Sequence, residues 1–281
     1  MKNKIVVVGN KGFIGSETYN LLKRKKYNVF GISKTEVDLT KKSSSEKLDK
    51  IINDGDTIIF VSAIAPCKEL KCIKKNILMV ENFIEGVGNK KLKQLINISS
   101  DAVYSDSSNK INESSQTNPN SFHGIMHNLR ENILNVYFGN ILTIVRPTLV
   151  YGLNDPHNGY GPNKFRRLID KDIDITLFGK GEEKRDHVYV GDISLLVEKI
   201  IKNKEFGIFN AVSSQVLSFN EIANFQKKIK SSKIKINNTK RIGPMPHDGL
   251  RQFSPSKGEK IFKDFKFTKI KTGIKRYLYG K

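Results

Sequence analysis

The sequence predicts an α/β fold in which a doubly wound parallel sheet carries helices on both of its faces. Over the first half of the chain, short runs rich in β-branched residues alternate with longer amphipathic stretches. The first apolar run, residues 5–8, leads directly into a turn that contains three glycines. After Pro147 the alternation loosens, and glycine and proline cluster at 159–162 and 243–246, which indicates a smaller C-terminal α/β lobe.

The elements of the first domain follow from this alternation. The strand ranges are rich in β-branched residues, and the helix ranges between them are amphipathic. The boundary with the C-terminal lobe is expected near Tyr151, which gives a first domain of residues 1–150 and a lobe of residues 151–281. A return of the chain into the first domain beyond that boundary is left open. The expected strands are residues 4–8, 29–33, 57–61, 94–99 and 142–145, and the expected helices are residues 17–25, 46–53, 74–87 and 126–138.

The glycine turn predicts a binding site for a pyrophosphate. Gly9 lets the chain turn off the strand, Gly12 lets backbone N–H groups approach a phosphate, and Gly15 lets the helix lie close to the sheet. The N-terminus of that helix adds partial positive charge. Phe13 and Ile14 belong to the same turn and are also expected to contact a cofactor. The turn predicts a Rossmann-type dinucleotide-binding domain, although its spacing is G-x-x-G-x-x-G rather than the commoner G-x-G-x-x-G.

The formal net charge of +21 permits two interpretations. A nucleic-acid-binding protein would gather its lysines on one face, with aromatic residues between them. In this chain the lysines are spread over almost every predicted helix and loop, and tryptophan is absent. The pattern favours a solvated surface that attracts anionic substrates, and a nucleic-acid partner is not expected.

Cysteine content and hydropathy limit the class of protein further. Cys67 and Cys72 are too few for a disulfide framework and lack the second pair of ligands that a zinc site needs, so we expect free thiols and no metal. No apolar stretch approaches the roughly 20 residues that span a bilayer. A strand begins almost at the first residue, which leaves no room for a signal peptide. A cytoplasmic protein without a membrane partner is therefore expected.

The residues after the second expected strand bear on the choice between NAD and NADP. An NAD site usually offers a carboxylate there to the ribose 2′-OH, whereas this strand ends in Ser33 and Lys34. A small hydroxyl and a cation suit a 2′-phosphate better, so NADP is favoured over NAD. Asp38, followed by Leu39, comes a few residues late and could contact the adenine or cap the next helix. Lys34 could also be one more surface lysine.

Small and hydroxyl-bearing residues follow the next two strands. Ser62, Ala63 and Ala65 come after the third strand, and Ser99 and Ser100 come after the fourth. Small residues at the carboxyl end of a parallel strand let a cofactor lie across it. The hydroxyls are expected where the strand ends meet the crevice.

Together with the glycine turn, this arrangement resembles the extended short-chain dehydrogenase/reductase family, whose members remodel nucleotide-linked sugars. Residues 146–152 resemble the family's R-P-x-x-V-Y-G segment, and residues 178–192 are similar to its G-x-G-x-x-x-R-D-x-x-x-V-x-D element. Asn76 matches a helix asparagine of the family, and 209–211 resembles its x-N-V strand. The matching segments occur in order and at plausible spacing along almost the whole chain.

The resemblance implies a cofactor across the strand ends, with Pro147 beside the nicotinamide, and a nucleoside-diphosphate sugar in the cleft. Arg185 would bind the diphosphate, for which a guanidinium fork is suited, and a salt bridge with Asp186 is the structural alternative. Tyr151 and Asn163 are further expected substrate contacts. The resemblance also implies that Ser100 hydrogen-bonds the reacting hydroxyl or carbonyl of the sugar.

The chain departs from the family at its catalytic pair. The family carries Y-x-x-x-K on the helix after the strand-end hydroxyls, with a tyrosine that transfers the proton and a lysine that lowers its pKa and holds the nicotinamide ribose. Here Gly124 and Glu131 fit the pattern, but His123 stands at the tyrosine and His127 at the lysine. Residues four apart share a helix face, so both histidines could face the cleft.

Three hypotheses remain for this pair. In the first, His123 acts as general acid/base and His127 holds the ribose. In the second, the redox site is lost and the protein only binds a cofactor or a sugar nucleotide. In the third, Tyr104 or Tyr160 serves as the acid. A purely structural role for both histidines is the remaining alternative.

The expected function is that of an NAD(P)-dependent oxidoreductase or epimerase of nucleoside-diphosphate sugars. Dehydratases of the family carry an Asp-Glu pair after the strand-end hydroxyl, whereas Asp101 is followed here by Ala102. Reduction or epimerisation of a keto-sugar is therefore favoured over dehydration. The alternative is a non-catalytic protein that binds a dinucleotide or sugar nucleotide. A homodimer is one expected assembly, and the sequence specifies neither the sugar nor the base.

Overall fold

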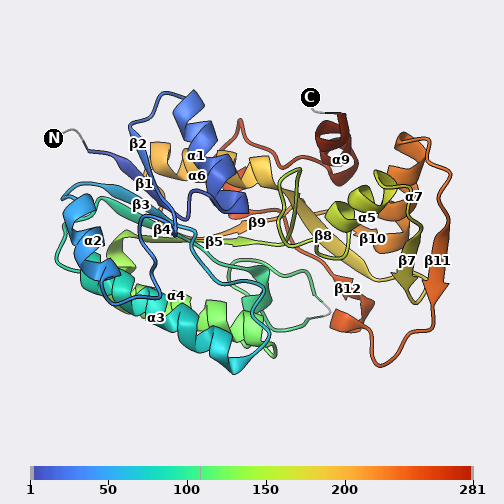
Figure 1. The fold of residues 1–281 in the computed structure, drawn as a ribbon, viewed down its shortest axis with the longest axis horizontal. Helices are drawn as coiled ribbons and strands as arrows, with labels where there is room; N and C mark the ends of the chain where they lie inside the picture. Colours follow the sequence, from blue (N-terminus) through green and yellow to red (C-terminus); the bar gives the residue numbers. More distant parts are fainter. Residues whose placement is uncertain (1–2, 108, 280–281) are drawn as a thin grey trace. The chain divides into compact units, whose positions relative to one another are not determined.

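A computed structural model describes residues 3–107 and 109–279, which divide into two compact units (Figure 1). The chain first enters the second unit for Asp106–Asn112, enters it again after Pro147, returns to the first unit at Ile193 and leaves it after Ala211. The first unit comprises Met1–Ser105, Glu113–Pro147 and Ile193–Ala211, and the second comprises Asp106–Asn112, Thr148–Asp192 and Val212–Lys281.

The first unit is built on a six-stranded sheet, which confirms the predicted doubly wound parallel fold. Its strand order is β2-β1-β3-β4-β5-β9, and each neighbouring pair is parallel. The chain runs outward from β1 in both directions, so the carboxyl ends of β1 and β3 form the point at which such sheets bind ligands. The strands are β1 (Ile5–Val8), β2 (Val29–Ile32), β3 (Thr57–Phe60), β4 (Gln94–Ile98), β5 (Leu142–Pro147) and β9 (Gly207–Ala211).

Helices cover both faces of this sheet, as Figure 1 shows. On one face, the Thr18 and Ser194 hydroxyls, 3.1 Å apart, join α1 to α6. On the other, Phe60 of β3 stacks on Phe83 of α3 with ring centroids 4.3 Å apart. No helix in the described ranges is both long and apolar enough to cross a membrane. The helices are α1 (Phe13–Arg24), α2 (Ser44–Ile51), α3 (Leu70–Val87), α4 (Phe122–Phe138) and α6 (Val190–Asn203), with single 3₁₀ turns η1 (Asp101–Val103) and η2 (Gly139–Ile141).

Helix α4 begins at Phe122, four residues before the start that the sequence predicts. Ser121 is its N-cap, and its hydroxyl accepts the Gly124 N–H at 3.1 Å. This cap adds one turn to the helix. His123 therefore lies in the first turn of a helix rather than in the loop before it.

The second unit has smaller, mixed sheets and its own core. Strand β8 pairs in parallel with β6 and β12 and antiparallel with β10, and β7 pairs in parallel with β11. Phe165, Phe219 and Ile274 belong to the core of this unit. Its strands are β6 (Leu149–Tyr151), β7 (Ile175–Phe178), β8 (Lys184–Tyr189), β10 (Val216–Ser218), β11 (Ile236–Thr239) and β12 (Leu250–Arg251), and its helices are α5 (Pro162–Ile169), α7 (Phe219–Ile229), α8 (Lys257–Ile261), α9 (Ile270–Tyr279) and the 3₁₀ segment η3 (Pro246–Gly249).

Candidate active site

The glycine turn between β1 and α1 forms a cradle for an anion. Gly9 has a φ of +102°, and a Cβ on Gly15 would lie 2.1 Å from the Gly9 carbonyl oxygen, so both positions require glycine. Gly12 is the N-cap of α1, and neither a capping side chain nor an acidic residue occupies the first turn. The N–H groups and partial positive charge of the helix end are therefore left for a ligand.

Two observations support a dinucleotide as that ligand. Phe13 and Ile14, the first residues of α1, are only half-buried in the folded chain. The buried Oδ1 atom of the Asn10 side chain has no hydrogen-bond partner within residues 3–107 and 109–279, and a buried polar atom of this kind is costly unless a ligand or water bonds it. The residues of the turn therefore fit the pyrophosphate of a dinucleotide.

A compact polar turn follows β2. The Ser33 N–H and hydroxyl both donate to the Glu36 carboxylate, the former at 2.8 Å, and these bonds lower the pKa of Glu36. Lys11, from the glycine turn, lies 4.0 Å from Glu36, and Lys34 is exposed. Glu36 is a carboxylate near this strand end that the sequence analysis did not consider. The sequence pattern that could have pointed to Glu36 is its S-x-x-E spacing from Ser33, which is typical of a capping box.

The remaining residues expected at the adenine end have local partners. The Asp38 carboxylate accepts the N–H and the hydroxyl of Thr40, at 3.1 and 2.7 Å, and these hydrogen bonds lower its pKa. Leu39 is buried in the core of the first unit, and its carbonyl oxygen accepts the Asn82 amide at 2.8 Å. Asp38 thus stabilises its own turn.

The segment after β3 lies against the glycine turn. A Cβ on Gly9 would lie 2.8 Å from the Ser62 Oγ atom, so the ends of β1 and β3 are in contact. Asn76 of α3 holds the next residues, because its Oδ1 accepts the Ile64 N–H at 2.9 Å and its Nδ2 donates to the Ile64 carbonyl at 3.0 Å. Ser62, Ala63 and Ala65 are half-buried at this edge.

The two serines after β4 have different surroundings. Ser99 is buried, and its hydroxyl donates to Glu131, which also receives two hydrogen bonds from Arg146 at 3.0 and 2.5 Å. Ser100 is half-buried, and its Oγ accepts the Ala102 N–H at 3.2 Å as the N-cap of η1. Ser100 is the better placed of the two for a ligand. Pro147, at the end of β5, is buried next to Ala211 of β9 in the register of the sheet.

Gly124 lets the first turn of α4 touch η1. A Cβ at this position would lie 2.1 Å from the Ala102 carbonyl oxygen and 2.6 Å from the Pro119 Cβ. Because the two elements are in contact, Ser100 and His123 belong to adjoining turns of the same unit. This contact is what joins the strand-end hydroxyl to the histidine pair.

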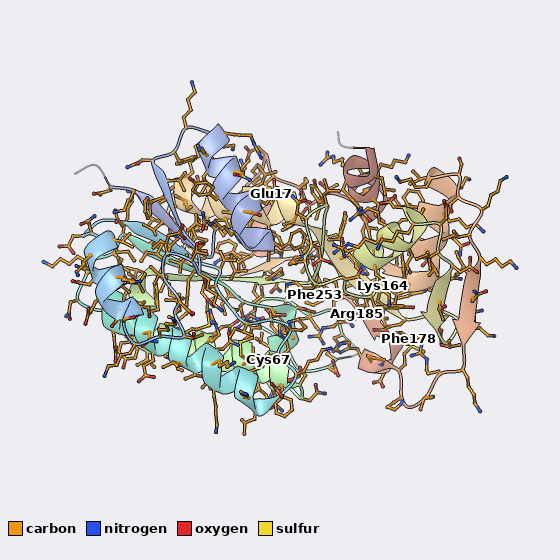
Figure 2. All side chains as sticks on the ribbon, viewed as in Figure 1. Glu17, Cys67, Lys164, Phe178, Arg185 and Phe253 are labelled. Carbon is orange, nitrogen blue, oxygen red and sulfur yellow. The ribbon has the colours of Figure 1, made fainter. Side chains whose placement is uncertain are left out.

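The rings of His123 and His127 meet edge to face, with centroids 4.7 Å apart. The Cys67 N–H donates to His123 Nδ1 at 3.4 Å, so the neutral ring carries its proton on Nε2 (Cys67 is labelled in Figure 2). Cys67 and Cys72 are both free thiols, and burial raises the pKa of Cys67 to about 11.

His127 is 5% exposed, and its Nδ1 has no hydrogen-bond partner in the described ranges of the chain. Burial, followed by the charges of His123 and Arg130, lowers the pKa of His127 well below its usual value. The ring is therefore neutral at physiological pH. The His127 ring therefore provides a buried nitrogen, Nδ1, that can form a hydrogen bond, but it provides no positive charge.

The alternative acids, Tyr104 and Tyr160, already have hydrogen-bond partners. The Tyr104 hydroxyl donates to Asn210 Oδ1 at 2.7 Å and burial raises its pKa. In the second unit, the Tyr160 oxygen accepts the Phe178 N–H at 3.1 Å, and burial likewise raises its pKa. Both shifts favour the neutral phenol over the phenolate that would accept a proton.

The expected substrate residues all lie in the second unit. Arg185, labelled in Figure 2, pairs with Glu183 at 3.1 Å rather than with Asp186, and lies in register with Arg251 across β8 and β12. The Tyr151 hydroxyl donates to the Ile270 carbonyl oxygen at 3.4 Å within the core of this unit. Asn163 accepts the Gly152 N–H and donates to the Val150 carbonyl oxygen.

Arg130 is a residue of this region that the sequence analysis missed. It is fully buried on the inward face of α4, one turn beyond His127, and it bonds the end of β3. The available signal was its spacing, because residues 123, 127, 130 and 134 fall on one face of a helix.

Comparisons with known proteins identify a matching family and similar folds. A family model described as NAD dependent epimerase/dehydratase family matches residues 5–211. The chain is 28% identical over 290 residues to a GDP-6-deoxy-D-talose 4-dehydrogenase of Aggregatibacter actinomycetemcomitans, with 95% of this chain and 94% of that protein covered. Its fold is similar to that of a UDP-glucose 4-epimerase from Thermus thermophilus in complex with NAD (TM-score 0.84, 19% identity, 98% of both chains). It is also similar to a UDP-glucuronic acid 4-epimerase from Bacillus cereus in complex with UDP-glucuronic acid and NAD (TM-score 0.81, 22% identity, 98% and 97% of the chains).

Proposed function

Because this chain belongs to the NAD dependent epimerase/dehydratase family, we propose that it is an NAD(P)-dependent oxidoreductase or epimerase acting on a nucleoside-diphosphate sugar. The observation that carries the proposal is the contact between α4 and η1, since it joins Ser100 to the His123–His127 pair beside a glycine cradle. Reduction or epimerisation of a keto-sugar is favoured over dehydration, because Ala102 has no side chain able to abstract a proton. The name of the 28% identical relative, a 4-dehydrogenase, supports hydride transfer at a sugar carbon.

His123 is the proposed acid/base. A nicotinamide bound across the strand ends would exchange hydride with the sugar carbon, and a protein group must exchange one proton with the attached oxygen. We assign this exchange to Nε2, the ring nitrogen that does not accept the Cys67 N–H in the folded chain. Proton transfer at Nε2 also requires Nδ1 to carry a proton, so the ring must leave Cys67. That hydrogen bond is long at 3.4 Å and costs little to break.

Ser100 and His127 have supporting roles in this proposal. The Ser100 hydroxyl would hydrogen-bond the reacting oxygen of the sugar. The partnerless Nδ1 of His127 would take up a ribose hydroxyl of the cofactor. A neutral imidazole can make this hydrogen bond but adds no positive charge.

NADP is the proposed cofactor, with Lys34 and Lys11 beside the adenosine 2′ position. The carboxylate of Glu36 opposes this preference, but its charge is balanced by Lys11 at 4.0 Å. Fluorescence titration with NADPH and NADH tests the proposal. Wild-type protein should bind NADPH more tightly, and Lys34→Ala should reduce that preference severalfold. A clear preference of the wild-type protein for NADH would refute it.

Turnover decides the catalytic proposal. Purified protein is incubated with NADP⁺ or NAD⁺ and either GDP-6-deoxy-D-talose or UDP-glucose, and the cofactor absorbance and the sugar products are followed. His123→Ala should lose turnover by about a hundredfold or more, while His157→Ala, which changes an exposed loop histidine, should retain it. Unchanged turnover in His123→Ala would exclude His123 as the acid/base.

A binding protein without turnover is the second candidate. The observation that favours it is a neutral His127 together with the Cys67 N–H on His123 Nδ1, because that hydrogen bond occupies a ring nitrogen that would have to take up a proton. In that case the wild-type protein would bind the cofactor tightly in the titration, yet neither the cofactor nor any sugar nucleotide would change.

We also propose that a second copy of the chain covers an apolar face of α4. Phe122, Ile125, Leu129 and Val136 are all exposed on that helix, Val136 by 81%. Exposed apolar residues at this spacing form a stripe along one side of a helix, which typically packs against a partner.

The neighbouring helix α3 carries charges that suit a second copy. Lys71 and Glu85 each lie seven residues from the exposed Leu78, and Lys75 and Glu81 each lie three residues from it. An antiparallel two-fold pairing centred on Leu78 would set each lysine opposite a glutamate of the second copy.

Sedimentation velocity tests this assembly. The wild-type protein should be a dimer, and Leu129→Glu should be a monomer of normal secondary structure. The matched control is Ile242→Glu, because Ile242 is 95% exposed in the second unit and should leave the dimer intact. A monomeric wild-type protein would overturn the proposal.

A further inference from the structure

Arg130 is a buried cation that pairs with no carboxylate in the part of the chain that the structure describes. Its side chain is fully buried. Nη2 donates to the Ser62 carbonyl oxygen at 2.8 Å, Nη1 donates to Asn76 Oδ1 at 3.3 Å, and the guanidinium lies 4.7 Å from the centroid of the Phe60 ring. Its Nε has no hydrogen-bond partner among the described residues. In residues 3–107 and 109–279, no ion pair includes Arg130.

This arrangement is costly for the chain by itself. Burying a guanidinium among neutral groups carries a desolvation penalty that carbonyl and amide oxygens only partly offset. Glu131, the next residue, is occupied by Arg146 at 2.5 Å. Burial lowers the pKa of Arg130 to about 10, so the side chain remains charged at neutral pH. Among the described residues, the charge of Arg130 therefore has no opposite charge paired with it at this edge of the sheet.

The location of this charge identifies what could balance it. Arg130 bonds the carbonyl oxygen of Ser62, the segment that follows β3. Ser62 touches Gly9, the residue that follows β1, since a Cβ on Gly9 would lie 2.9 Å from the Ser62 nitrogen. Ser62 thus separates the guanidinium from the glycine turn at the ends of β1 and β3. This turn is the site at which we expect an anion to bind.

We propose that Arg130 is the buried counter-charge of the bound dinucleotide and acts on its pyrophosphate through the low-dielectric wall formed by Ser62. This inference rests on the proposed dinucleotide binding and assigns a residue to it. Arg130 is a positioning residue, because Ser62 separates it from the cradle. Two charges separated by such a wall still attract each other strongly, because little water screens them.

The test compares variants that separate charge from hydrogen bonding. ADP-ribose is the probe, since it carries the pyrophosphate without the nicotinamide, and its dissociation constant is measured by calorimetry. Arg130→Gln keeps an N–H donor for Ser62 but loses the charge, and should weaken binding by about tenfold. Arg130→Lys keeps the charge and should stay within about threefold of wild type.

Salt separates this buried charge from a surface charge. Lys11→Gln is the matched control, because the Lys11 side chain is 66% exposed beside the same turn. At high salt the loss caused by Lys11→Gln should vanish, whereas the loss caused by Arg130→Gln should persist.

Each other outcome has a definite meaning. Equal ADP-ribose affinity in Arg130→Gln and wild type overturns the inference, and so does an equal loss in the Gln and Lys variants. If Arg130→Gln and Arg130→Met both fail to fold while Arg130→Lys folds, the charge stabilises the fold without a ligand, and the inference is also wrong. Absence of ADP-ribose binding by the wild-type protein would instead refute the proposed function itself.

Discussion

Gly124→Ala tests whether the contact between α4 and η1 positions His123. The added Cβ would lie 2.1 Å from the Ala102 carbonyl oxygen, so reaching even a tight contact of 3.0 Å requires the two backbones to separate by about 0.9 Å. A displacement of about 1 Å in a catalytic group can reduce turnover about a hundredfold. The cost in stability is smaller, because overpacking of about 1–3 kcal/mol is partly offset by about 1 kcal/mol of helix propensity gained with alanine.

Three measurements on the same preparation distinguish these effects. Turnover of a sugar nucleotide should fall about a hundredfold, affinity for NADPH should stay near wild type, and the melting temperature should drop by only a few degrees. Gly139→Ala is the matched control at the other end of α4, because its Cβ would meet only the flexible Asn135 side chain at 3.3 Å. Full turnover in Gly124→Ala would refute the reasoning that this contact sets the position of His123.

Three further outcomes are expected. Gly15→Ala should weaken NADPH binding by about tenfold or more, because its Cβ would lie 2.1 Å from the Gly9 oxygen; unchanged affinity in a fluorescence titration would contradict this. Arg146→Met should lower the free energy of unfolding in urea by about 3–5 kcal/mol, because it leaves the Glu131 carboxylate buried and unpaired, and Ser99→Ala should cost only about 1 kcal/mol. The free energy of unfolding should also fall as the pH drops below 6.5. Burial lowers the pKa of His187 to about 3, so between these values the unfolded chain binds a proton that the folded chain excludes. The slope of the free energy of unfolding against pH should therefore be smaller by about 1.4 kcal/mol per pH unit in His187→Gln. A slope equal to that of the wild-type protein would show that another group titrates.

The strands of the first unit could be predicted closely from the sequence. Each is an apolar run, and strands buried on both faces need such continuous runs. Residues 57–61 were expected as a strand, and β3 spans Thr57–Phe60 with every residue buried. The edges at which the strands end were therefore predictable as well.

The starts of the helices were harder to predict, and they carry much of the candidate site. Helix α1 begins at Phe13 rather than at residue 17, and α4 begins at Phe122 rather than at residue 126. These first turns contain glycines and a capping serine, Ser121, and show little apolar periodicity. A prediction from apolar periodicity therefore places the start of each helix one turn too late.

Which partner each buried polar group bonds could not be predicted. Ser99 reaches Glu131 across 32 residues of sequence, and Arg130 reaches Ser62 across 68. Such pairs depend on how α4 packs on the sheet, which local spacing does not encode. The sequence could place Ser99 and Ser100 at one strand end but not distinguish the buried hydroxyl from the half-buried one.

The effect of Arg130 on His127 constrains how this site can change over evolutionary time. Because the guanidinium already lowers the pKa of His127, a lysine at position 127 would bring a second positive charge into the same buried region. Mutation to lysine at 127 alone should therefore be selected against, and an engineer who restores a tyrosine–lysine pair must also replace Arg130. Among relatives of this chain, the residues at these two positions should vary together, with at most one of them cationic.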